Sequence, residues 1–488
     1  MNKLKILVFS LFALLVIQTL VFIFFVWYNN DKGFRKFIDK NLIAYLRGGE
    51  ITTNQVPTLN DIVSYRIYGD LKDDVVYSVK FLSNYTLLLG SKEVKNNTDL
   101  WLIAIDDSGS VIKDLTFDEG GEEIGLSLDC FGEDIYLSSE VNWEKGKGDV
   151  WFLKLTNFAV EWDVAIVGSD NESYPVIKYL SDESIVCAFS SKTPYSNSVS
   201  LSLFHIKQGD FTNIKSFESP ISQVPIAIVE VSNGYWIIGE TKSFSFGESD
   251  IFVASFSKDD ELKWFKIYGT KFFESPVQAM VVDDGVLISV SSRIFSLMKL
   301  DFDGNVVWIK NYSKGSISQF FVDNDYLIAT GTIYDPYSYK NMFVLKEGKD
   351  VFWEDFFSFS YDEVPNGIFS KSDVVYLIGN SYSDVTKKDV WFVKLKNLTN
   401  IYMSNSVSNF YFVDTNKLMV KDILPSFTNF LVSSTNESVF SIISKYSLPN
   451  NLASRFEREL KAKKLKEKSK KKKTKKSSIK DLNSFKTF

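Results

Sequence analysis

Short apolar runs and polar turns alternate along most of the chain, and the pattern repeats about every 48 residues. The runs are rich in β-branched and aromatic residues, which is typical of β-strands. One polar turn between two apolar runs recurs in register seven times, at residues 83–84, 132–134, 181–183, 232–234, 283–285, 323–325 and 370–373. This spacing predicts that one β-strand unit is repeated along the chain.

Each unit contains four predicted strands. The run after the first turn ends in glycine, as at residues 87–90 and 236–239, where we expect a side chain to crowd the neighbouring unit. A second turn, such as residues 301–304, leads to a strand with aromatic residues, such as 306–309. Four short antiparallel strands cannot bury their own apolar faces and must stack on neighbours until a ring closes. The sequence therefore predicts an all-β fold, a β-propeller of four-stranded blades, over residues 62–447.

Two observations bear on the number of blades. Residues 409–447 contain weaker strand and turn signals, which favours eight blades, with seven blades as the alternative. Residues 64–69 resemble residues 264–269, so we expect them to supply the outer strand of the last blade and to close the ring. The strands that contain Trp264 and Trp308 are expected to lie outermost in their blades.

Residues 6–27 form a charge-free and mostly apolar stretch of 22 residues. At about 1.5 Å per residue, a helix of this length crosses about 30 Å of hydrocarbon, so the stretch predicts a transmembrane helix in the lipid bilayer. Bulky residues follow it, whereas a cleavable signal peptide ends in small residues. We therefore interpret residues 1–30 as a retained signal anchor, with Trp27 and Tyr28 at the membrane interface.

Two rules give opposite orientations for this anchor. Two lysines precede the apolar stretch and five basic residues follow it by residue 47, a count that places the propeller in the cytoplasm. A very short basic N-terminus followed at once by an apolar run is instead typical of exported proteins. We expect a single-pass protein of the cell membrane with an extracytoplasmic propeller, and the cytoplasmic orientation is the alternative.

The segments on either side of the predicted propeller carry different signals. Residues 31–61 contain an amphipathic helix and a linker, and the helix either lies on the lipid surface or packs beneath the propeller. Residues 448–488 are predicted to form a short helix and a disordered lysine-rich tail. From residue 451 onward the net charge is +11, which leaves −17 for the rest of the chain. We expect this tail to bind anionic lipid or another polyanion, or to fold back weakly on the acidic body.

Few side chains in this sequence suit catalysis or tight metal binding. His205 is the single histidine, so no multi-histidine metal site exists, and we interpret it as a surface or hydrogen-bonded strand residue. Cys130 and Cys187 fall in different units, which favours buried free thiols over a disulfide. Neither a Walker nor a Rossmann glycine pattern occurs. The sequence therefore identifies no catalytic, cofactor-binding or metal-binding residue, and no cofactor is expected.

Aspartates recur at one position of the repeat. Asp99, Asp149, Asp250 and Asp389 each open a third strand, and we expect them to accept backbone N–H bonds that hold turns. Residues 301–305 partly match a calcium-binding loop but lack its later bidentate glutamate, so a β-turn is the favoured interpretation.

Two phrases in the repeats resemble a known group of proteins. The phrase Asp-Φ-Trp-Φ-Φ-Lys-Leu, in which Φ is apolar, occurs at residues 149–155 and 389–395, and Asp-x-x-Gly-x-x-x-Trp occurs at 301–308. They resemble the repeats of bacterial exported β-propellers, including the quinoprotein-like group and its non-catalytic scaffold members. In the quinoprotein enzymes the cofactor site has calcium ligands and a vicinal disulfide, and neither cysteine here has a cysteine neighbour. The resemblance therefore implies a scaffold or binding propeller.

The leading functional hypothesis is a membrane-anchored propeller that binds a protein or a cell-envelope polymer on one face. The alternative is a carbohydrate-active enzyme that uses carboxylates in the central channel as acid and base. Acidic residues between blades, such as Glu119, Glu122, Glu123 and Glu274, suit either function. Two carboxylates about 5 to 10 Å apart beside an aromatic side chain would favour the enzyme.

Overall fold

The computed structural model describes most of the repeat region. The described residues are 62–69, 72–95, 97–144, 147–168, 171–192, 199–207, 210–212, 214–217, 221–294, 296–312, 315–323, 326–333, 341–348, 352–357, 362–372, 374–383, 387–396, 410–413, 418–423, 427–430 and 441–443. The predicted anchor, amphipathic helix and basic tail lie outside these residues. Within them, no helix has the length and apolar character needed to cross a membrane.

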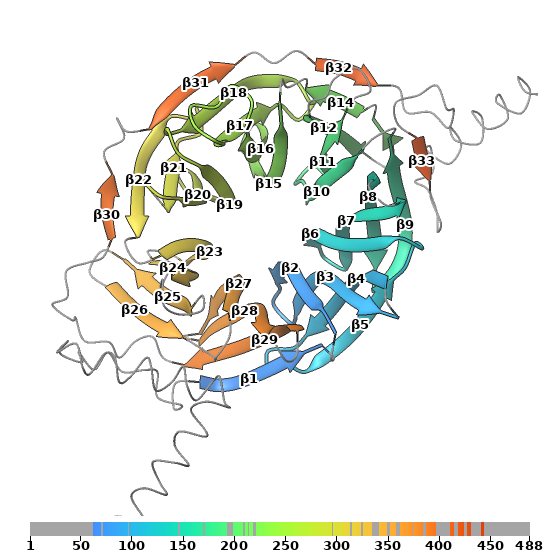
Figure 1. Ribbon diagram of the computed structural model, residues 1–488, viewed down its shortest axis with the longest axis vertical. Coiled ribbons are helices and arrows are strands. Elements are labelled where there is room, and N and C mark those ends of the chain that lie inside the picture. Colours follow the sequence, from blue (N-terminus) through green and yellow to red (C-terminus); the bar gives the residue numbers. More distant parts are fainter. Residues whose placement is uncertain are drawn as a thin grey trace, which may run out of the picture. The chain divides into compact units, whose positions relative to one another are not determined.

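Seven antiparallel sheets surround a central axis, so the chain forms a β-propeller (Figure 1). The prediction of eight blades is wrong, and the seven-bladed alternative is correct. One strand of each blade lies nearest the axis. These inner strands, from blade 1 to blade 7, are β2 (Asp74–Phe81), β6 (Glu122–Phe131), β10 (Glu172–Tyr179), β15 (Gln223–Val231), β19 (Glu274–Val282), β23 (Gly315–Asp323) and β27 (Asp362–Lys371).

The second and third strands follow each inner strand outward. In blade order, the second strands are β3 (Thr86–Val94), β7 (Asp134–Glu144), β11 (Ile185–Lys192), β16 (Gly234–Thr241), β20 (Gly285–Ser292), β24 (Tyr326–Ile333) and β28 (Val374–Ser383). The third strands are β4 (Asn97–Ile105), β8 (Lys147–Thr156), β12 (Val199–Lys207), β17 (Asp250–Phe256), β21 (Leu297–Leu300), β25 (Asn341–Glu347) and β29 (Lys387–Lys396). The short strand β13 (Asp210–Phe211) pairs with β12.

The fourth strands come from two parts of the sequence. Blades 1 to 6 use the strand that follows in the chain, namely β5 (Val111–Phe117), β9 (Ala159–Val167), β14 (Ile214–Phe217), β18 (Leu262–Gly269), β22 (Val306–Tyr312) and β26 (Phe352–Phe357). Blade 7 instead uses β1 (Ile62–Tyr68), which pairs antiparallel with β29. The prediction that this N-terminal segment closes the ring is therefore confirmed.

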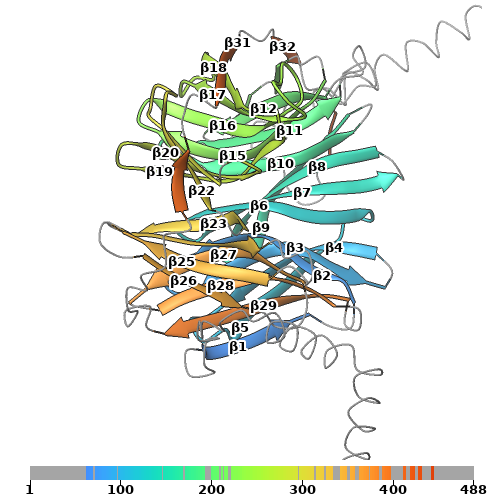
Figure 2. The same ribbon diagram turned by 60° about the vertical axis from the view of Figure 1, so that its left-hand side comes forward.

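Four further strands wrap the outside of the ring. They are β30 (Phe410–Val413), β31 (Met419–Ile423), β32 (Phe427–Phe430) and β33 (Ser441–Ile443), and we call them the belt. They pair in turn with β22, β18, β14 and β9, so the belt passes blades 5, 4, 3 and 2 in the order opposite to the chain (Figures 1 and 2).

The belt overturns two predictions. Residues 409–447 were expected to form a blade, but strands this short add to edges that already exist instead of pairing with one another. Trp264 and Trp308 lie on the fourth strands β18 and β22, and belt strands pair outside both, so these tryptophans are not on the outermost strands.

Apolar side chains from neighbouring blades pack between the sheets. Trp101, Trp151, Trp236 and Trp391, one each from blades 1, 2, 4 and 7, are at most 2 % exposed. The backbone of the inner strand β2 passes so close to Gly90 that no side chain fits there. A Cβ at this position would lie 1.8 Å from the carbonyl oxygen of Val75. The crowding therefore comes from the same blade, and the expectation of a clash with the neighbouring blade is wrong at this position.

Candidate functional site

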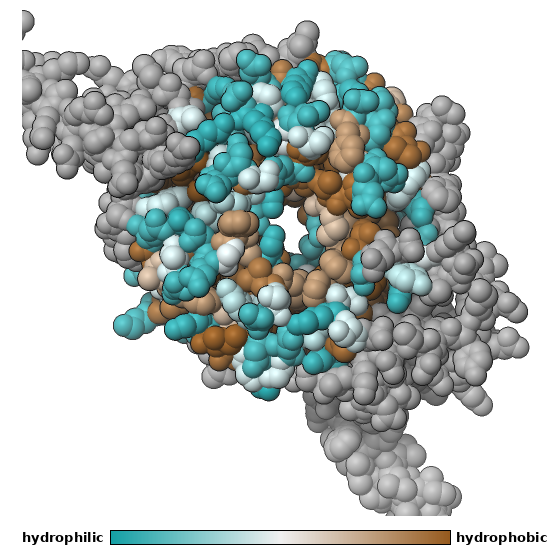
Figure 3. Space-filling view, turned by 180° about the vertical axis from the view of Figure 1, so that it is seen from behind, coloured by the Kyte–Doolittle hydropathy of each residue, from teal (hydrophilic) through white to brown (hydrophobic). Residues whose placement is uncertain are grey.

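The inner strands of all seven blades line a central channel. Figure 3 shows the opening at the centre of one face of the ring. The channel encloses a cavity of about 650 Å³. Every inner strand shifts register near its middle, as between Val76 and Ser78 on β2. Such β-bulges bend and twist a strand, and here they fall beside the cavity.

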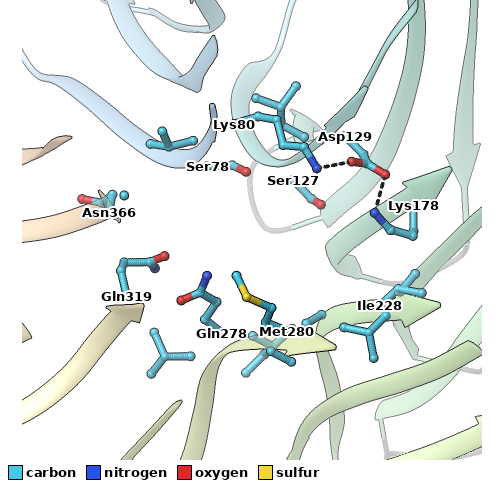
Figure 4. A pocket seen from close by; sticks show the side chains of 18 of the residues that line it. Ser78, Lys80, Ser127, Asp129, Lys178, Ile228, Gln278, Met280, Gln319 and Asn366 are labelled. Carbon is cyan, nitrogen blue, oxygen red and sulfur yellow. Dashed lines mark hydrogen bonds and ion pairs between the residues drawn. The ribbon is translucent and has the colours of Figure 1, made fainter. Parts of the chain in front are cut away.

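A charged cluster forms one part of the channel wall. Lys80, Asp129 and Lys178 occupy equivalent positions on the inner strands of blades 1, 2 and 3, and Asp129 lies 2.8 Å from each ammonium nitrogen (Figure 4). The backbone N–H of Tyr179 also donates to Asp129, at 3.0 Å. Burial acts to raise the pKa of Asp129, but Lys178 and Lys80 outweigh it and hold that pKa below its ordinary value. Asp129 is therefore an ionised structural carboxylate.

The wall formed by blades 4 to 6 is mostly apolar or carries uncharged amides, and Glu230 on β15 of blade 4 is its charged residue. Ile228 and Met280 line the cavity from blades 4 and 5 (Figure 4). Gln278 bridges two blades, because its amide donates to the carbonyl of Phe320 at 3.1 Å and accepts from the N–H of Phe320 at 2.7 Å. Of the four charged residues among the described lining residues, three therefore lie together on blades 1 to 3.

Exposed aromatic residues gather at one end of the ring, which we call the entry face because the inner strands begin there. Six large apolar side chains on this face are 36–55 % exposed: Tyr77, Tyr174, Ile221, Phe244, Phe273 and Tyr382. The opposite face carries three, namely Phe131, Val281 and Phe302. The other large exposed apolar side chains among the described residues lie on outer strands. Exposed aromatic side chains are enriched at interaction surfaces.

A carboxyl group lies within this aromatic surface. Burial raises the pKa of Tyr77, and Tyr382 and Glu140 act on it electrostatically in the same direction. Glu140 accepts the backbone N–H of Tyr174 at 2.6 Å. Burial also raises the pKa of Glu140 above its ordinary value. The entry face therefore combines tyrosines with an acid that holds its proton more strongly than usual.

The recurring aspartates lie at the junctions between blades, and each meets an acid of the next inner strand. The N–H of Gly168 donates to both Asp149 and Glu172, at 3.3 and 2.9 Å. Corresponding pairs form at other junctions: Asp389 with Asp74, Asp99 with Glu123, and Asp250 with Glu274. The pairing with a second carboxyl group was not predicted from the sequence.

The expected turn contacts are present for two of these aspartates. Asp149 accepts from Gly168, and Asp250 accepts the backbone N–H of Phe246. Asp99 instead accepts from the side-chain amide of Asn97, at 3.2 Å. Burial is the main cause that raises the pKa of Asp250 to about 7 and that of Glu123 to about 8.

His205 is buried between blades 3 and 4. Its Nε2 lies 2.9 Å from Asp260, which also accepts a hydrogen bond of 2.7 Å from the hydroxyl of Tyr235. His205 is 0% exposed, so the interpretation as a surface residue is wrong, and Asp260 is its polar partner. Cys130 and Cys187 are free thiols, as predicted, although Cys130 is only partly buried.

The turn at residues 301–305 is also confirmed. Asp301 accepts the backbone N–H groups of Asp303 and Asn305, at 3.0 and 2.7 Å. Gly304 has a φ of 74°, which favours glycine. These contacts are those of a β-turn stabilised by its own aspartate.

Comparison with known proteins gives structural matches alone. No family model and no curated protein matches the sequence. The polysaccharide lyase Uly1 matches with a TM-score of 0.39 and 10% identity, over 67% of this chain and 91% of that one. An acylaminoacyl peptidase from Pyrococcus horikoshii matches with a TM-score of 0.39 and 11% identity, over 65% of this chain and 51% of that one. A mutant Trypanosoma rangeli sialidase matches with a TM-score of 0.37 and 8% identity, over 69% and 59%.

Similarity at this level concerns the fold and carries no argument on activity. The β-propeller architecture that the sequence resemblance implied is present. The bacterial, exported and quinoprotein-like parts of that resemblance remain predictions. The described part of the chain is a seven-bladed β-propeller.

Proposed function

We propose that this protein is a membrane-anchored β-propeller that binds a protein or a cell-envelope polymer through its entry face. Residues 6–27 anchor it in the cell membrane, and the propeller lies outside the cytoplasm. The observation that carries the proposal is the gathering of exposed aromatic side chains on the entry face. Tyrosine and phenylalanine are enriched where proteins bind partners, because they bury a large area and lose little side-chain entropy.

The channel supports binding over catalysis. Glycoside hydrolysis requires a protonated acid and a second carboxylate on either side of the bond that is cleaved. The described residues that line the cavity include two carboxylates, Asp129 and Glu230. Asp129 is held ionised by two lysines, and Glu230 accepts hydrogen bonds from the N–H and the hydroxyl of Ser181. Neither arrangement provides a general acid.

One observation favours the enzyme as a second candidate. Burial raises the pKa of Glu140, which accepts the backbone N–H of the exposed Tyr174 on the entry face. An acid that holds its proton can serve as the proton donor in carbohydrate cleavage. The variant Glu140→Gln separates the two functions, because it abolishes product formation by an enzyme and leaves the affinity of a binding module nearly unchanged.

The entry face is tested with two matched double variants of the full chain in detergent. Tyr174→Ala with Phe244→Ala removes rings from the entry face, and Phe131→Ala with Phe302→Ala removes rings from the opposite face. Ligands captured by the wild-type protein from cross-linked cells, and purified cell-wall polymers, are then titrated against each variant. We expect at least tenfold weaker binding for the entry-face variant alone. Equal losses in both variants would contradict the assignment.

Fractionation tests the anchor. We expect the protein to stay in membranes after high-salt and carbonate washing, and to be released when residues 1–30 are removed. Protease access from outside intact cells tests the orientation. A soluble mature form that begins after Tyr28 would contradict the anchor, and protection of the propeller would place it in the cytoplasm.

A further inference from the structure

Three carboxylates converge at the junction between blades 1 and 2. Asp99 lies near the start of β4, Asp118 follows β5, and Glu123 lies near the start of β6. Each offers an oxygen atom, and these three atoms lie within 4.8 Å of one another. Asp99 and Glu123 are 6 % and 0 % exposed, whereas Asp118 is exposed at the surface. The cluster therefore has a buried floor and one side open to solvent.

Other blade junctions show that the third carboxylate is a departure from the repeat. Strand register places Gly69 and Gly269 at the positions that correspond to Asp118. A Cβ at Gly69 would lie 2.7 Å from an oxygen of Asp74, and one at Gly269 would lie 2.1 Å from an oxygen of Asp250. Those junctions accommodate two carboxyl groups and leave no room for a third.

One oxygen of Glu123 has no hydrogen-bond partner. Its Oε1 accepts the N–H of Gly121 at 2.9 Å. Its Oε2 is buried and accepts no hydrogen bond. Asp118 acts electrostatically on both Asp99 and Glu123, and Asp99 acts on Glu123. A buried carboxyl oxygen without a donor lacks the contact that buried polar atoms normally have.

We propose that Asp99, Asp118 and Glu123 bind a divalent metal ion, and that the ion is Ca²⁺. Carboxylate oxygens are the ligands that hard cations prefer, and an ion at the centre would give the Oε2 atom its missing contact. Ca²⁺ accepts six to eight oxygen ligands in a flexible arrangement, which three carboxylates and water can supply, whereas Mg²⁺ demands near-ideal octahedral geometry. The open side at Asp118 leaves positions for water ligands. This site is independent of the aromatic entry-face proposal.

The test uses the full chain in detergent, freed of metal with a chelator and titrated with CaCl₂ or MgCl₂ in a calorimeter. Asp118→Asn is the test variant, because this exposed side chain can change without disturbing the core. Glu122→Gln is the matched control, since it removes the same charge from an exposed residue of the same loop. We expect one Ca²⁺ per wild-type chain, a melting temperature that rises with Ca²⁺, and at least tenfold weaker binding for Asp118→Asn. Glu122→Gln should bind as the wild type does.

Three results would overturn the proposal. The first is no saturable Ca²⁺ binding by the wild-type protein. The second is an equal loss in Asp118→Asn and Glu122→Gln, which would reflect the general charge of the surface. The third is tighter binding of Mg²⁺ than of Ca²⁺, which would reject the assigned ion. Circular dichroism spectra of both variants establish that each remains folded before its affinity is compared.

Discussion

Asp250 and Glu274 form a buried carboxyl pair at the junction between blades 4 and 5. Both side chains are 0 % exposed, and Thr270 donates to Glu274 from its backbone N–H at 2.8 Å and from its hydroxyl at 2.6 Å. Burial raises the pKa of Asp250 from 3.8 to about 7, and Glu274 contributes in the same direction. A proton kept on Asp250 avoids placing two negative charges together.

This pair predicts that the stability of the propeller falls as the pH rises. Between about pH 4 and pH 7 the folded protein keeps a proton on Asp250 that the unfolded chain releases. The stabilisation is complete below this window and is lost above it. In the wild-type protein, the free energy of unfolding should fall between pH 5 and pH 8. In Asp250→Asn this fall should be smaller, by at most about 3 kcal/mol.

Denaturant unfolding at the two pH values measures this difference. Asp259→Asn is the control, because the side chain of Asp259 is 90% exposed. The control should keep the pH dependence of the wild type. A pH dependence in Asp250→Asn equal to that of the wild type would show that Asp250 does not hold a proton in the folded state.

The charged cluster of the channel predicts a cost for removing its carboxylate. Asp129→Asn leaves the ammonium groups of Lys80 and Lys178 close together without a compensating charge. We expect a loss of about 1–3 kcal/mol in unfolding free energy, measured by denaturant titration. Asp107→Asn breaks a half-exposed pair with Lys371 and should cost less than about 0.5 kcal/mol. Similar losses in the two variants would mean that the channel cluster is no better shielded from solvent than a surface pair.

Equivalent tyrosine hydroxyls link two pairs of blades. Tyr68 donates to the carbonyl of Gly109 at 2.6 Å, and Tyr268 donates to the carbonyl of Gly304 at 2.7 Å. We expect Tyr68→Phe and Tyr268→Phe each to lower the unfolding free energy by about 1 kcal/mol, because each leaves a buried carbonyl without this donor. Tyr174→Phe, in an exposed ring, is the control and should melt with the wild type. Unchanged melting of both test variants would show that the hydroxyls do not stabilise the ring.

The basic tail predicts an electrostatic contact that is separable from the propeller. From residue 451 onward the chain carries 15 basic and 4 acidic residues. We expect the protein to bind anionic vesicles with an affinity that falls steeply with salt, and deletion of residues 461–488 to abolish this binding. Neutral vesicles provide the control in a sedimentation assay. If the truncation lowers the melting temperature by many degrees, the tail is instead part of the folded domain.

The repeat could be predicted from the sequence because it depends on local patterns. Turn residues and apolar alternation at residues 83–84 or 232–234 have the same meaning in every blade. Residues 409–447 have the alternation of strands too, and this pattern does not distinguish a strand of a new blade from a strand added to an existing edge. The partner of such a strand is distant in the sequence, so only the folded structure identifies it.

The candidate sites were harder to predict because their residues come from different blades. Asp99 and Glu123 were interpreted separately, as a turn aspartate and as part of an acidic loop. Strand pairing and blade stacking bring them together. A signal was nevertheless present: an acid recurs one or two residues before the register shift of five inner strands, at Asp74, Glu123, Glu172, Glu274 and Glu363. Lys80, Asp129 and Lys178 are likewise separated by 49 residues each, the length of one repeat.

The belt links the solubility of the propeller to the completion of its synthesis. Its four strands come from residues 410–443, so a ribosome makes all seven inner strands before the outer edges of blades 2 to 5 receive their last strand. Until then, β9, β14, β18 and β22 present backbone donors and acceptors that strands of another chain can pair with. A chain that stops near residue 400, or is cut there by a protease, retains a closed ring in which these four edges are bare as well, and is therefore prone to aggregate.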